Sequence, residues 1–244
     1  MRLGSIALCL FVSLPALGRP LTVLIDPGHG GSNVGAPSRH PGLYEKQITL
    51  AIARALKQQL SLAGHRALLS RDEDRFLTVR QRSRQAKQLG ADLFLSIHAN
   101  ASVAHDKHGV ETYVLDHQTA ELDEHRASAA VTGAEVLFTG LRTLDVRQRS
   151  IALGRVVQAA LARERAAEDN RGVREGGYDV LAGLEVPAVL VEVGFLDHPA
   201  EGARLLQASE QQRIAYALAQ AIDQFAKSEP APFAILRREN GGER

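Results

Sequence analysis

Two histidines each follow an apolar run of residues in this chain. His29 lies in the stretch IDPGHGG, after the run Leu21–Ile25, and His98 comes directly after the run Leu93–Ile97 in the sequence. Runs of this kind are typical of strands buried on both faces of a parallel sheet. The carboxyl ends of such strands meet at one edge of the sheet, where ligands bind, so we expect two imidazoles there. On its own, His29 fits an ordinary loop histidine equally well.

Glu45 is the third candidate metal ligand. It opens a helix predicted over Tyr44–Ala63, sixteen residues after His29. A helix that follows a parallel strand starts again near the carboxyl end of that strand, so Glu45 can face His29 and His98. Two histidines and a glutamate, with a fourth position left for water, form the ligand set of a catalytic zinc site. Taken alone, Glu45 is also explained as an acid that the helix dipole favours at a helix start.

Glu192 is the candidate general acid and base. It lies in the apolar run Ala188–Val193, where a carboxylate is costly to bury unless it is paired or used in chemistry. Close to a zinc-bound water, a glutamate can accept the proton of that water and pass it to a leaving amine. The alternative is a structural glutamate that accepts hydrogen bonds from backbone amides. Together, the four residues predict metal-assisted hydrolysis.

Some polar residues have two interpretations. Asp26 either orients the metal loop through a hydrogen bond or simply forms a turn before Pro27. Asn100 and Arg171 either contact substrate or have structural roles. His105 and His108 lie in a polar loop, where we expect solvated side chains rather than metal ligands.

The order of apolar segments predicts the fold that positions these residues. Strand-like runs alternate with helical periodicity, which indicates a parallel sheet covered by helices. We therefore expect a single α/β domain, with a largely parallel twisted sheet of about six strands and helices on both faces. The expected strands are 21–25, 65–70, 92–97, 110–115, 178–181 and 188–193, and the expected helices are 44–63, 77–89, 149–167 and 201–226.

The first eighteen residues, MRLGSIALCLFVSLPALG, have the pattern of a signal peptide, and the alternative is an uncleaved membrane anchor. Cleavage there would start the mature chain at Arg19 and remove Cys9, the only cysteine. The chain has 29 basic and 28 acidic residues and the leader carries one arginine and no acid, so the mature net charge is formally zero. This balance argues against a nucleic-acid partner. No later segment approaches a membrane span. We expect an exported monomer, periplasmic or extracellular.

Several further motifs occur in a fixed order along the chain. They are IDPGHGG, the acid of Tyr44-Glu45-Lys46 before a long helix, SIHAN, GVETYVL, Arg171-Gly172-Val173 and VPAVLVEVGFLDHPAE. In this order they resemble the signatures of the zinc-dependent N-acetylmuramoyl-L-alanine amidases, the amidase-3 family of cell-wall hydrolases. The resemblance extends from Leu21 to Ala226, essentially the whole predicted mature domain. Any one of these motifs would be a weak signal, and their succession makes the resemblance specific.

The resemblance implies a substrate as well as a set of roles. His29, Glu45 and His98 would bind one zinc ion, and Glu192 would be the catalytic acid and base. The bond cut would be the amide between N-acetylmuramic acid and L-alanine in peptidoglycan, attacked by a zinc-activated water. Two alternatives remain, a catalytically silent domain that binds cell wall or zinc, and a zinc carboxypeptidase-like protease. The second lacks the short His-x-x-Glu spacing common in such enzymes.

One segment departs from the compact pattern of this family. The catalytic domain is expected over 19–226, with a flexible tail at 227–244, but residues 117–148 form an additional segment rich in Glu, Ala and Leu. The resemblance implies a helical insertion that occludes the zinc until a protein activator displaces it. Under this capping hypothesis, the carboxylates that could reach a metal are Glu121, Glu124 and Glu135. The alternative is a solvated surface helix.

Overall fold

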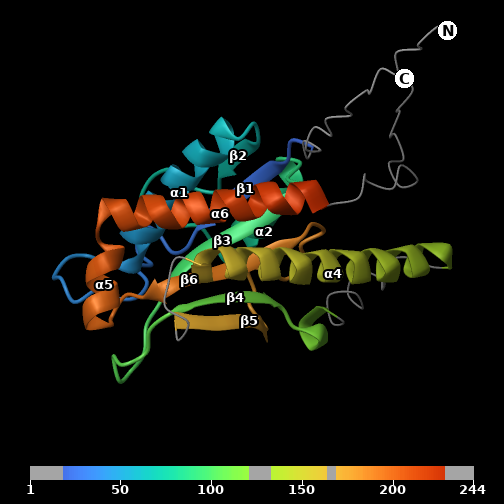
Figure 1. Cartoon of the computed structure of the whole chain (residues 1–244). Helices are drawn as coiled ribbons and strands as arrows, with labels where there is room; N and C mark the ends of the chain where they lie inside the picture. The colour runs from blue at the N-terminus through green and yellow to red at the C-terminus, as the bar shows by residue number, and fades with distance from the viewer. Residues whose placement is uncertain (1–18, 121–132, 164–168, 229–244) are drawn as a thin grey trace, which may run out of the picture.

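The computed structural model of the chain describes residues 19–120, 133–163 and 169–228. One six-stranded sheet, in the order β2-β1-β3-β6-β4-β5, has helices on both faces (Figure 1). The predicted α/β fold with a mostly parallel sheet is therefore confirmed. The strands are β1 Thr22–Pro27, β2 Arg66–Leu69, β3 Leu93–Asn100, β4 Val110–Leu115, β5 Asn170–Gly176 and β6 Ala188–Phe195, and the helices are α1 Glu45–Leu62, α2 Val79–Gln88, α4 Ala134–Arg163, α5 Pro199–Leu205 and α6 Ala208–Ser228.

The direction of the strands changes once across the sheet. Strands β2, β1, β3 and β6 are parallel, whereas β4 runs antiparallel to β6 and β5 runs parallel to β4. One edge of the sheet is therefore formed by the carboxyl ends of β1, β3 and β6 and by the amino ends of β4 and β5. We call this set of strand ends the site edge, and the set at the other ends of the same strands the opposite edge.

Apolar side chains on the two faces of the sheet form two cores. The larger core joins alternate residues of β1, β3 and β6 to α1, α4 and α6, which cover one face of the sheet. The smaller core lies on the other face, where Ala86 of α2 and the segment around Leu181 pack on Leu24, Phe94 and Leu190. In α1, buried residues recur at helical intervals, as at Ile48, Ile52, Leu56 and Leu60. Burial on both faces explains why the central strands are almost continuously apolar.

Three expected elements differ in the structure. Residues 178–181, expected as a strand, form a turn, and the strand that completes the sheet is the polar β5. The helix expected at 201–226 is two helices, α5 and α6, separated at Leu206 and Gln207. The helix expected at 149–167 begins earlier, because α4 runs without a break from Ala134 to Arg163. Its thirty residues give a helix about 45 Å long.

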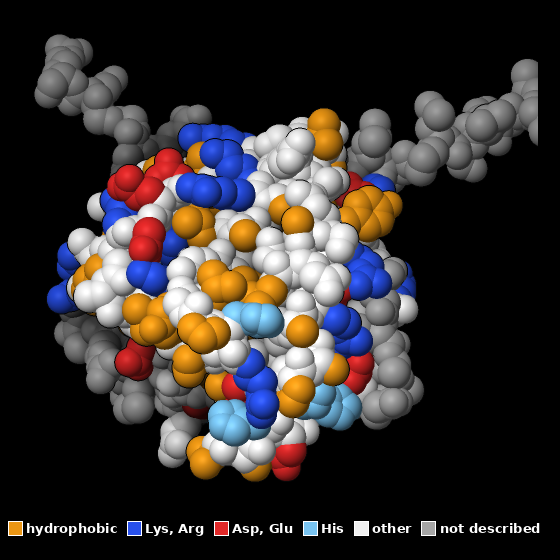
Figure 2. Space-filling view, turned by 90° about the vertical axis from the view of Figure 1, so that its left-hand side faces the viewer, with side chains coloured by type: hydrophobic (Ala, Val, Ile, Leu, Met, Phe, Trp, Pro, Cys, Tyr) orange, Lys and Arg blue, Asp and Glu red, His pale blue; other side chains and the backbone are white. Residues whose placement is uncertain are grey.

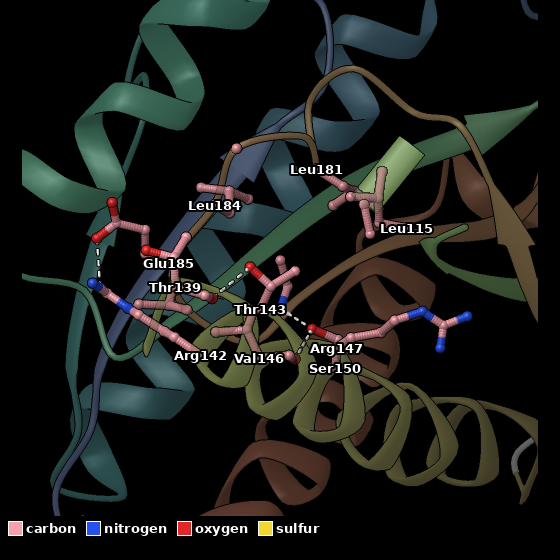
Figure 3. A pocket seen from close by; sticks show the side chains of 14 residues that line it. Leu115, Thr139, Arg142, Thr143, Val146, Arg147, Ser150, Leu181, Leu184 and Glu185 are labelled. Carbon is pink, nitrogen blue, oxygen red and sulfur yellow. Dashed lines mark hydrogen bonds and ion pairs between the residues drawn. The ribbon is translucent and has the colours of Figure 1, made fainter. Parts of the chain in front are cut away.

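The described part of the 117–148 segment lies at the opposite edge. Because β4 is antiparallel to β6, the chain leaves β4 at that edge, and α4 starts from there (Figure 1). Arg142 of α4 pairs with Glu185, three residues before β6. Beside them lies a cavity of about 250 Å³, lined by Thr139, Arg142, Thr143 and Val146 of α4 and by Leu115, Leu181 and Leu184 (Figure 3).

Within the described ranges, we find no helix with both the length and the apolar character that a bilayer crossing requires.

Candidate metal centre and active site

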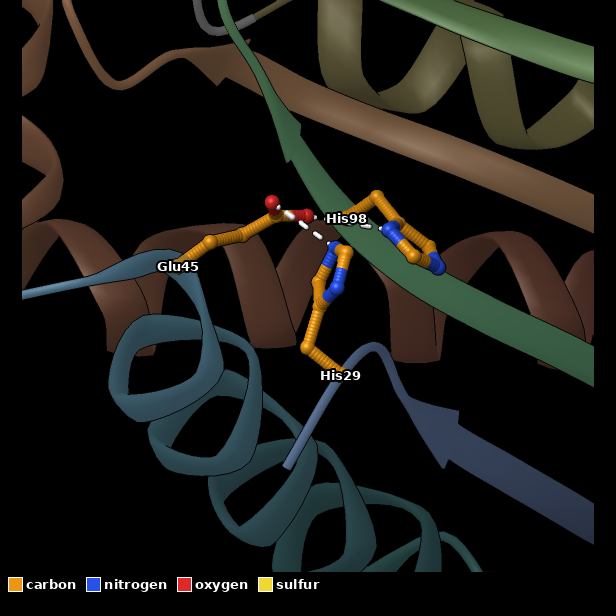
Figure 4. A group of neighbouring side chains, drawn as sticks. All are labelled: His29, Glu45 and His98. Atoms are coloured by element: carbon orange, nitrogen blue, oxygen red, sulfur yellow. Dashed lines mark hydrogen bonds and ion pairs between the residues drawn. The ribbon is translucent and has the colours of Figure 1, made fainter. Parts of the chain in front are cut away.

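The three predicted metal ligands meet at the site edge. His29 follows β1, Glu45 is the first residue of α1, and His98 lies near the end of β3 (Figure 4). His29 Nε2 is 2.8 Å from Glu45 Oε2, and His98 Nδ1 is 2.9 Å from Glu45 Oε1. One nitrogen or oxygen of each side chain lies within 4.8 Å of the others. Two ligands on one tetrahedral zinc ion are about 3.4 Å apart, so small side-chain movements would accommodate the ion.

Glu45 does not act merely as an acid at a helix start. Its side chain is buried, and its two oxygens accept hydrogen bonds from the backbone amides of Ala36 and Ala99 as well as facing both histidines. The carboxylate is thus fixed between the loop that precedes α1 and the end of β3. This explains why the first residue of a long helix takes part in a site formed mostly by strands.

The loop after β1 holds His29 in an uncommon backbone conformation. His29 has φ of +60°, and Gly30 and Gly31 also have positive φ. A left-handed conformation costs a non-glycine residue about 1–3 kcal/mol and is found mainly where the surrounding structure enforces it. Here the backbones of Gly30 and Asn33 bond to each other, and His29 Nδ1 lies 2.9 Å from Asn33 Oδ1. The second ring nitrogen of His29 is therefore held, which leaves Nε2 toward Glu45.

A buried ion pair between β1 and α2 holds this loop in place. Arg82 of α2 donates to Asp26 Oδ1 at 2.7 Å and also to the carbonyl oxygens of Pro27 and His29. Ser70 and Ser96 donate to the same carboxylate of Asp26. Asp26 lies within β1 and is completely buried, so it is not a turn residue, and it acts on the loop through Arg82 rather than by touching His29. Of the two interpretations of Asp26, the structure supports the orienting one.

Two glycines leave room for the site. A Cβ on Gly28 would lie 2.5–2.7 Å from three atoms of the His98 ring. A Cβ on Gly35 would lie 2.6 Å from Glu45 Oε2 and 2.7 Å from His29 Cδ2. Any larger residue at either position would displace a predicted ligand.

The electrostatics favour an ionised Glu45. Burial raises the pKa of this carboxyl, but the hydrogen bonds from His29 and His98 outweigh burial and hold the pKa well below its usual range. Burial lowers the pKa of His29, because it disfavours the charged imidazolium. The hydrogen bond to Glu45 and the charge of that carboxylate outweigh burial and raise the pKa of His29 above 6.5. An anionic carboxylate between two imidazoles suits a divalent cation, because the cation would replace the protons that now satisfy Glu45.

Glu192 lies directly beside this group. In the strand register, His98 of β3 pairs with Glu192 of β6, and Glu192 pairs with Glu111 of β4. Burial, followed by the negative charges of Glu45 and Glu111, raises the pKa of Glu192 well above 4.5. Its Oε2 atom is buried and has no hydrogen-bond partner among the described residues. A carboxyl that readily keeps its proton and has a free oxygen can serve as a general acid.

Glu111 is the site residue that sequence reasoning missed. It is buried, and its carboxylate accepts hydrogen bonds from Asn100 Nδ2 at 2.8 Å and Arg171 Nε at 2.9 Å. Asn100 and Arg171, the two residues left open between substrate and structural roles, are therefore both anchored on Glu111. The signal in the sequence was a second acid in an apolar strand, in GVETYVL.

The remaining candidates lie apart from the three ligands. His105 and His108 contact Asp197 and Asp169, each at 2.6 Å, so both are paired rather than simply solvated, and neither reaches the ligand group. Figure 2 looks onto the site edge and shows histidine side chains there, with basic side chains beside them.

The expected cap does not cover the site in the described part of the chain. Glu135 lies in the first turn of α4, which begins at the opposite edge, because β4 is antiparallel and carries the chain away from the ligands. Glu121 and Glu124 lie outside the described residues. The expectation that Glu135 reaches the metal is therefore wrong.

Comparison with known proteins agrees with this geometry. The model of the family described as N-acetylmuramoyl-L-alanine amidase (Amidase_3) matches residues 23–224. This chain belongs to that family. Among curated amidases, the probable N-acetylmuramoyl-L-alanine amidase AmiB of Haemophilus influenzae is 32% identical over 233 residues, which cover 87% of this chain and 54% of the relative. AmiC of Neisseria meningitidis serogroup B is 32% identical over 237 residues, 91% of this chain and 55% of the relative. The chain thus spans about half the length of these two amidases.

Solved structures of amidases have the same fold. An N-acetylmuramoyl-L-alanine amidase from Clostridium difficile 630 superposes with a TM-score of 0.70 at 27% identity, covering 86% of this chain and 99% of the other. AmiC2 of Nostoc punctiforme gives a TM-score of 0.68 at 30% identity, covering 84% and 96%. The match therefore extends over nearly the whole of each of these two amidase chains.

Proposed function

We propose that this protein hydrolyses the amide bond between N-acetylmuramic acid and L-alanine in peptidoglycan, with zinc as its cofactor. The observation that carries the proposal is the group His29, Glu45 and His98 with Glu192 next to it in the strand register. Membership of the amidase family supports the identity of the bond.

The described residues fit a single zinc ion. Two imidazoles and one carboxylate are a common set of protein ligands in catalytic zinc sites, which keep one position open. Glu192 Oε2 is buried and has no hydrogen-bond partner among the described residues. Because buried polar atoms normally have a partner, this atom supports a bound polar group, such as a water molecule or the substrate, next to Glu192. When bound, zinc supplies Lewis-acid chemistry, which activates water and polarises the scissile carbonyl.

The protein's own residues position the substrate and move the proton. Glu192 lies one strand from His98, so its carboxyl group would lie close to the leaving nitrogen of a substrate bound at the three ligands. As base it takes the proton of the attacking water, and as acid it gives a proton to the nitrogen of L-alanine, so that the amine leaves neutral. The low-polarity surroundings that raise the pKa of Glu192 favour the second step.

Export, oligomeric state and regulation belong to the same proposal. The protein would act as a monomer outside the cytoplasm after removal of residues 1–18, and in wall remodelling such as daughter-cell separation. The segment 117–148 would bind a protein activator. Thr139 and Thr143 of α4 line the cavity between α4 and the rest of the domain, so a deletion that included them would also disturb packing. Capping is therefore tested by deletion of 121–132 alone. A rise in peptidoglycan hydrolysis would support capping, and unchanged hydrolysis by a folded variant would refute it.

The decisive experiment uses purified peptidoglycan and the protein from Arg19 to Arg244. We expect zinc-dependent release of soluble peptides with a new L-alanine amino terminus, abolished by a chelator and by Glu192→Gln. Arg66→Gln, exposed at the start of β2 on the opposite edge and outside 117–148, is the control and should be fully active. If the folded, zinc-loaded protein binds peptidoglycan without releasing peptides, the alternative of a silent wall-binding domain holds instead.

A further inference from the structure

Two arginines of β5 are anchored on one buried carboxylate beside Glu192. Arg171 Nε lies 2.9 Å and Arg174 Nε 3.1 Å from the same oxygen, Oε2 of Glu111. The other oxygen of Glu111 accepts from Asn100. Glu111 is only 2% exposed, whereas the arginine side chains are 24% and 48% exposed. A buried acid thus holds two cations that extend from it into solvent.

A bulge in β5 brings these two side chains together. Residues three apart in a regular strand point to opposite faces of the sheet. Here Val110 pairs with Asn170 but Thr112 pairs with Val173, so β5 has one residue more than β4 at this point. Gly172, inside the bulge, has φ of +83°, a conformation that glycine adopts without strain. Bulges next to active sites commonly redirect a side chain, and this one turns Arg171 and Arg174 toward the same acid.

The outer nitrogens of both arginines remain available. Each guanidinium contacts Glu111 through Nε, and in the described part of the chain neither donates a hydrogen bond from its Nη atoms. The guanidinium carbon of Arg171 also lies 5.0 Å from the centre of the Phe195 ring, which restricts its movement. A fixed guanidinium fork is the geometry that binds a carboxylate through two parallel hydrogen bonds.

The distance between the two arginines and the proposed position of the reacting bond fits one carboxylate group of the substrate. Neighbouring strands are about 4.8 Å apart, so Glu111 lies about 5 Å from the strand of Glu192 and about 10 Å from that of His98. In peptidoglycan, L-alanine is followed by a glutamate linked through its side chain, which leaves its α-carboxyl group free. This carboxylate is about 6 Å from the leaving nitrogen of alanine, given consecutive Cα atoms about 3.8 Å apart.

We propose that Arg171 and Arg174, positioned by Glu111, bind the free α-carboxylate of the second residue of the stem peptide. This inference rests on the proposed amidase function and gives it a substrate preference. Substrates in which this carboxylate is free would be preferred over those in which it is amidated, because a neutral amide cannot form the charge-assisted pair. The pair would also place the alanine nitrogen in front of Glu192.

The test uses two matched substrates, muramoyl tripeptides that carry either the free α-carboxylate or its carboxamide at the second residue. Hydrolysis is measured as kcat and KM for the zinc-loaded wild type, Arg171→Gln, Arg174→Gln and the control Arg66→Gln, which lies at the start of β2 on the opposite edge. Binding of both substrates to the same proteins carrying Glu192→Gln is measured by calorimetry, independently of turnover. Because Arg174 is half exposed, its variant keeps the Arg171–Glu111 pair and remains informative if Arg171→Gln fails to fold.

We expect the wild type and Arg66→Gln to prefer the carboxylate substrate by about 10-fold or more, in kcat/KM and in affinity. Arg171→Gln and Arg174→Gln should reduce that preference toward unity, with little change in the rate on the amide. Equal use of both substrates by an active wild type would overturn the carboxylate site and leave the amidase function intact. Binding that discriminates between the substrates without any hydrolysis would support the site and contradict the amidase function. Absence of both hydrolysis and discrimination would overturn the two together.

Discussion

Gly28→Ala is the substitution whose effect on the metal centre can be worked out most directly. The added Cβ would lie 2.5, 2.7 and 2.7 Å from Cε1, Nδ1 and Nε2 of His98. The optimal separation of two nonbonded carbon atoms is about 3.5 Å or more. The His98 ring must therefore move by about 1 Å. That is about half the length of a zinc–nitrogen bond, so the proposed zinc ligand His98 would lose its binding geometry.

The expected loss of zinc affinity is about 100-fold, or about 2.7 kcal/mol. The backbone itself should tolerate alanine, because Gly28 is not among the residues with positive φ. Affinity would be measured by competition with a chromophoric chelator, and folding by circular dichroism. Gly154→Ala is the control, since the atoms nearest to its Cβ in α4 are methyl carbons of Val114 and Val173, at 3.3 Å, and of Thr112, at 3.7 Å, and none of these residues is a predicted ligand. A zinc affinity of Gly28→Ala within about 3-fold of the wild type, where His98→Ala has lost zinc, would refute this account of the glycine.

Three further predictions concern the acid, the support of the loop and the pH dependence of stability. Glu192→Gln should lower peptidoglycan hydrolysis by at least about 100-fold while zinc affinity stays unchanged, and substantial residual activity would exclude Glu192 as the proton donor. Asp26→Asn should lower the free energy of unfolding in urea by about 3 kcal/mol, because it leaves Arg82 buried without its counter-charge, and a loss below about 1 kcal/mol would contradict that role. Burial lowers the pKa of His65 below 6.5, so the unfolded chain binds this proton more readily, and stability must fall as the pH drops through 6.5 toward the folded pKa. Urea unfolding at pH 7.5 and 5.5 should show a smaller fall for His65→Asn than for the wild type, and an equal fall would show that other groups cause it.

Much of the site was accessible from the sequence because its residues lie next to features that periodicity reveals. His29 and His98 follow buried strands and Glu45 starts a helix, so the order of strands and helices already places all three at one edge. Glu192 stood out as an acid in an apolar run. Glu111 was equally visible as an acid in β4 but was not recognised, because its partners Asn100 and Arg171 are distant in the sequence and only the strand pairing brings them together.

The α/β class, most strand and helix positions and the candidate ligands can be predicted from local sequence patterns, since buried strands and amphipathic helices have distinct periods. The direction of β4 depends on its pairing with β6, and the residues of GVETYVL do not encode it because either pairing direction can bury the same side chains. That direction sends the chain after Leu115 to the opposite edge, away from the ligands. The polar strand β5 was likewise decided by pairing with β4, not by apolar residues of its own. Local patterns specify which side chains are buried, and the contacts between distant segments specify where each segment lies.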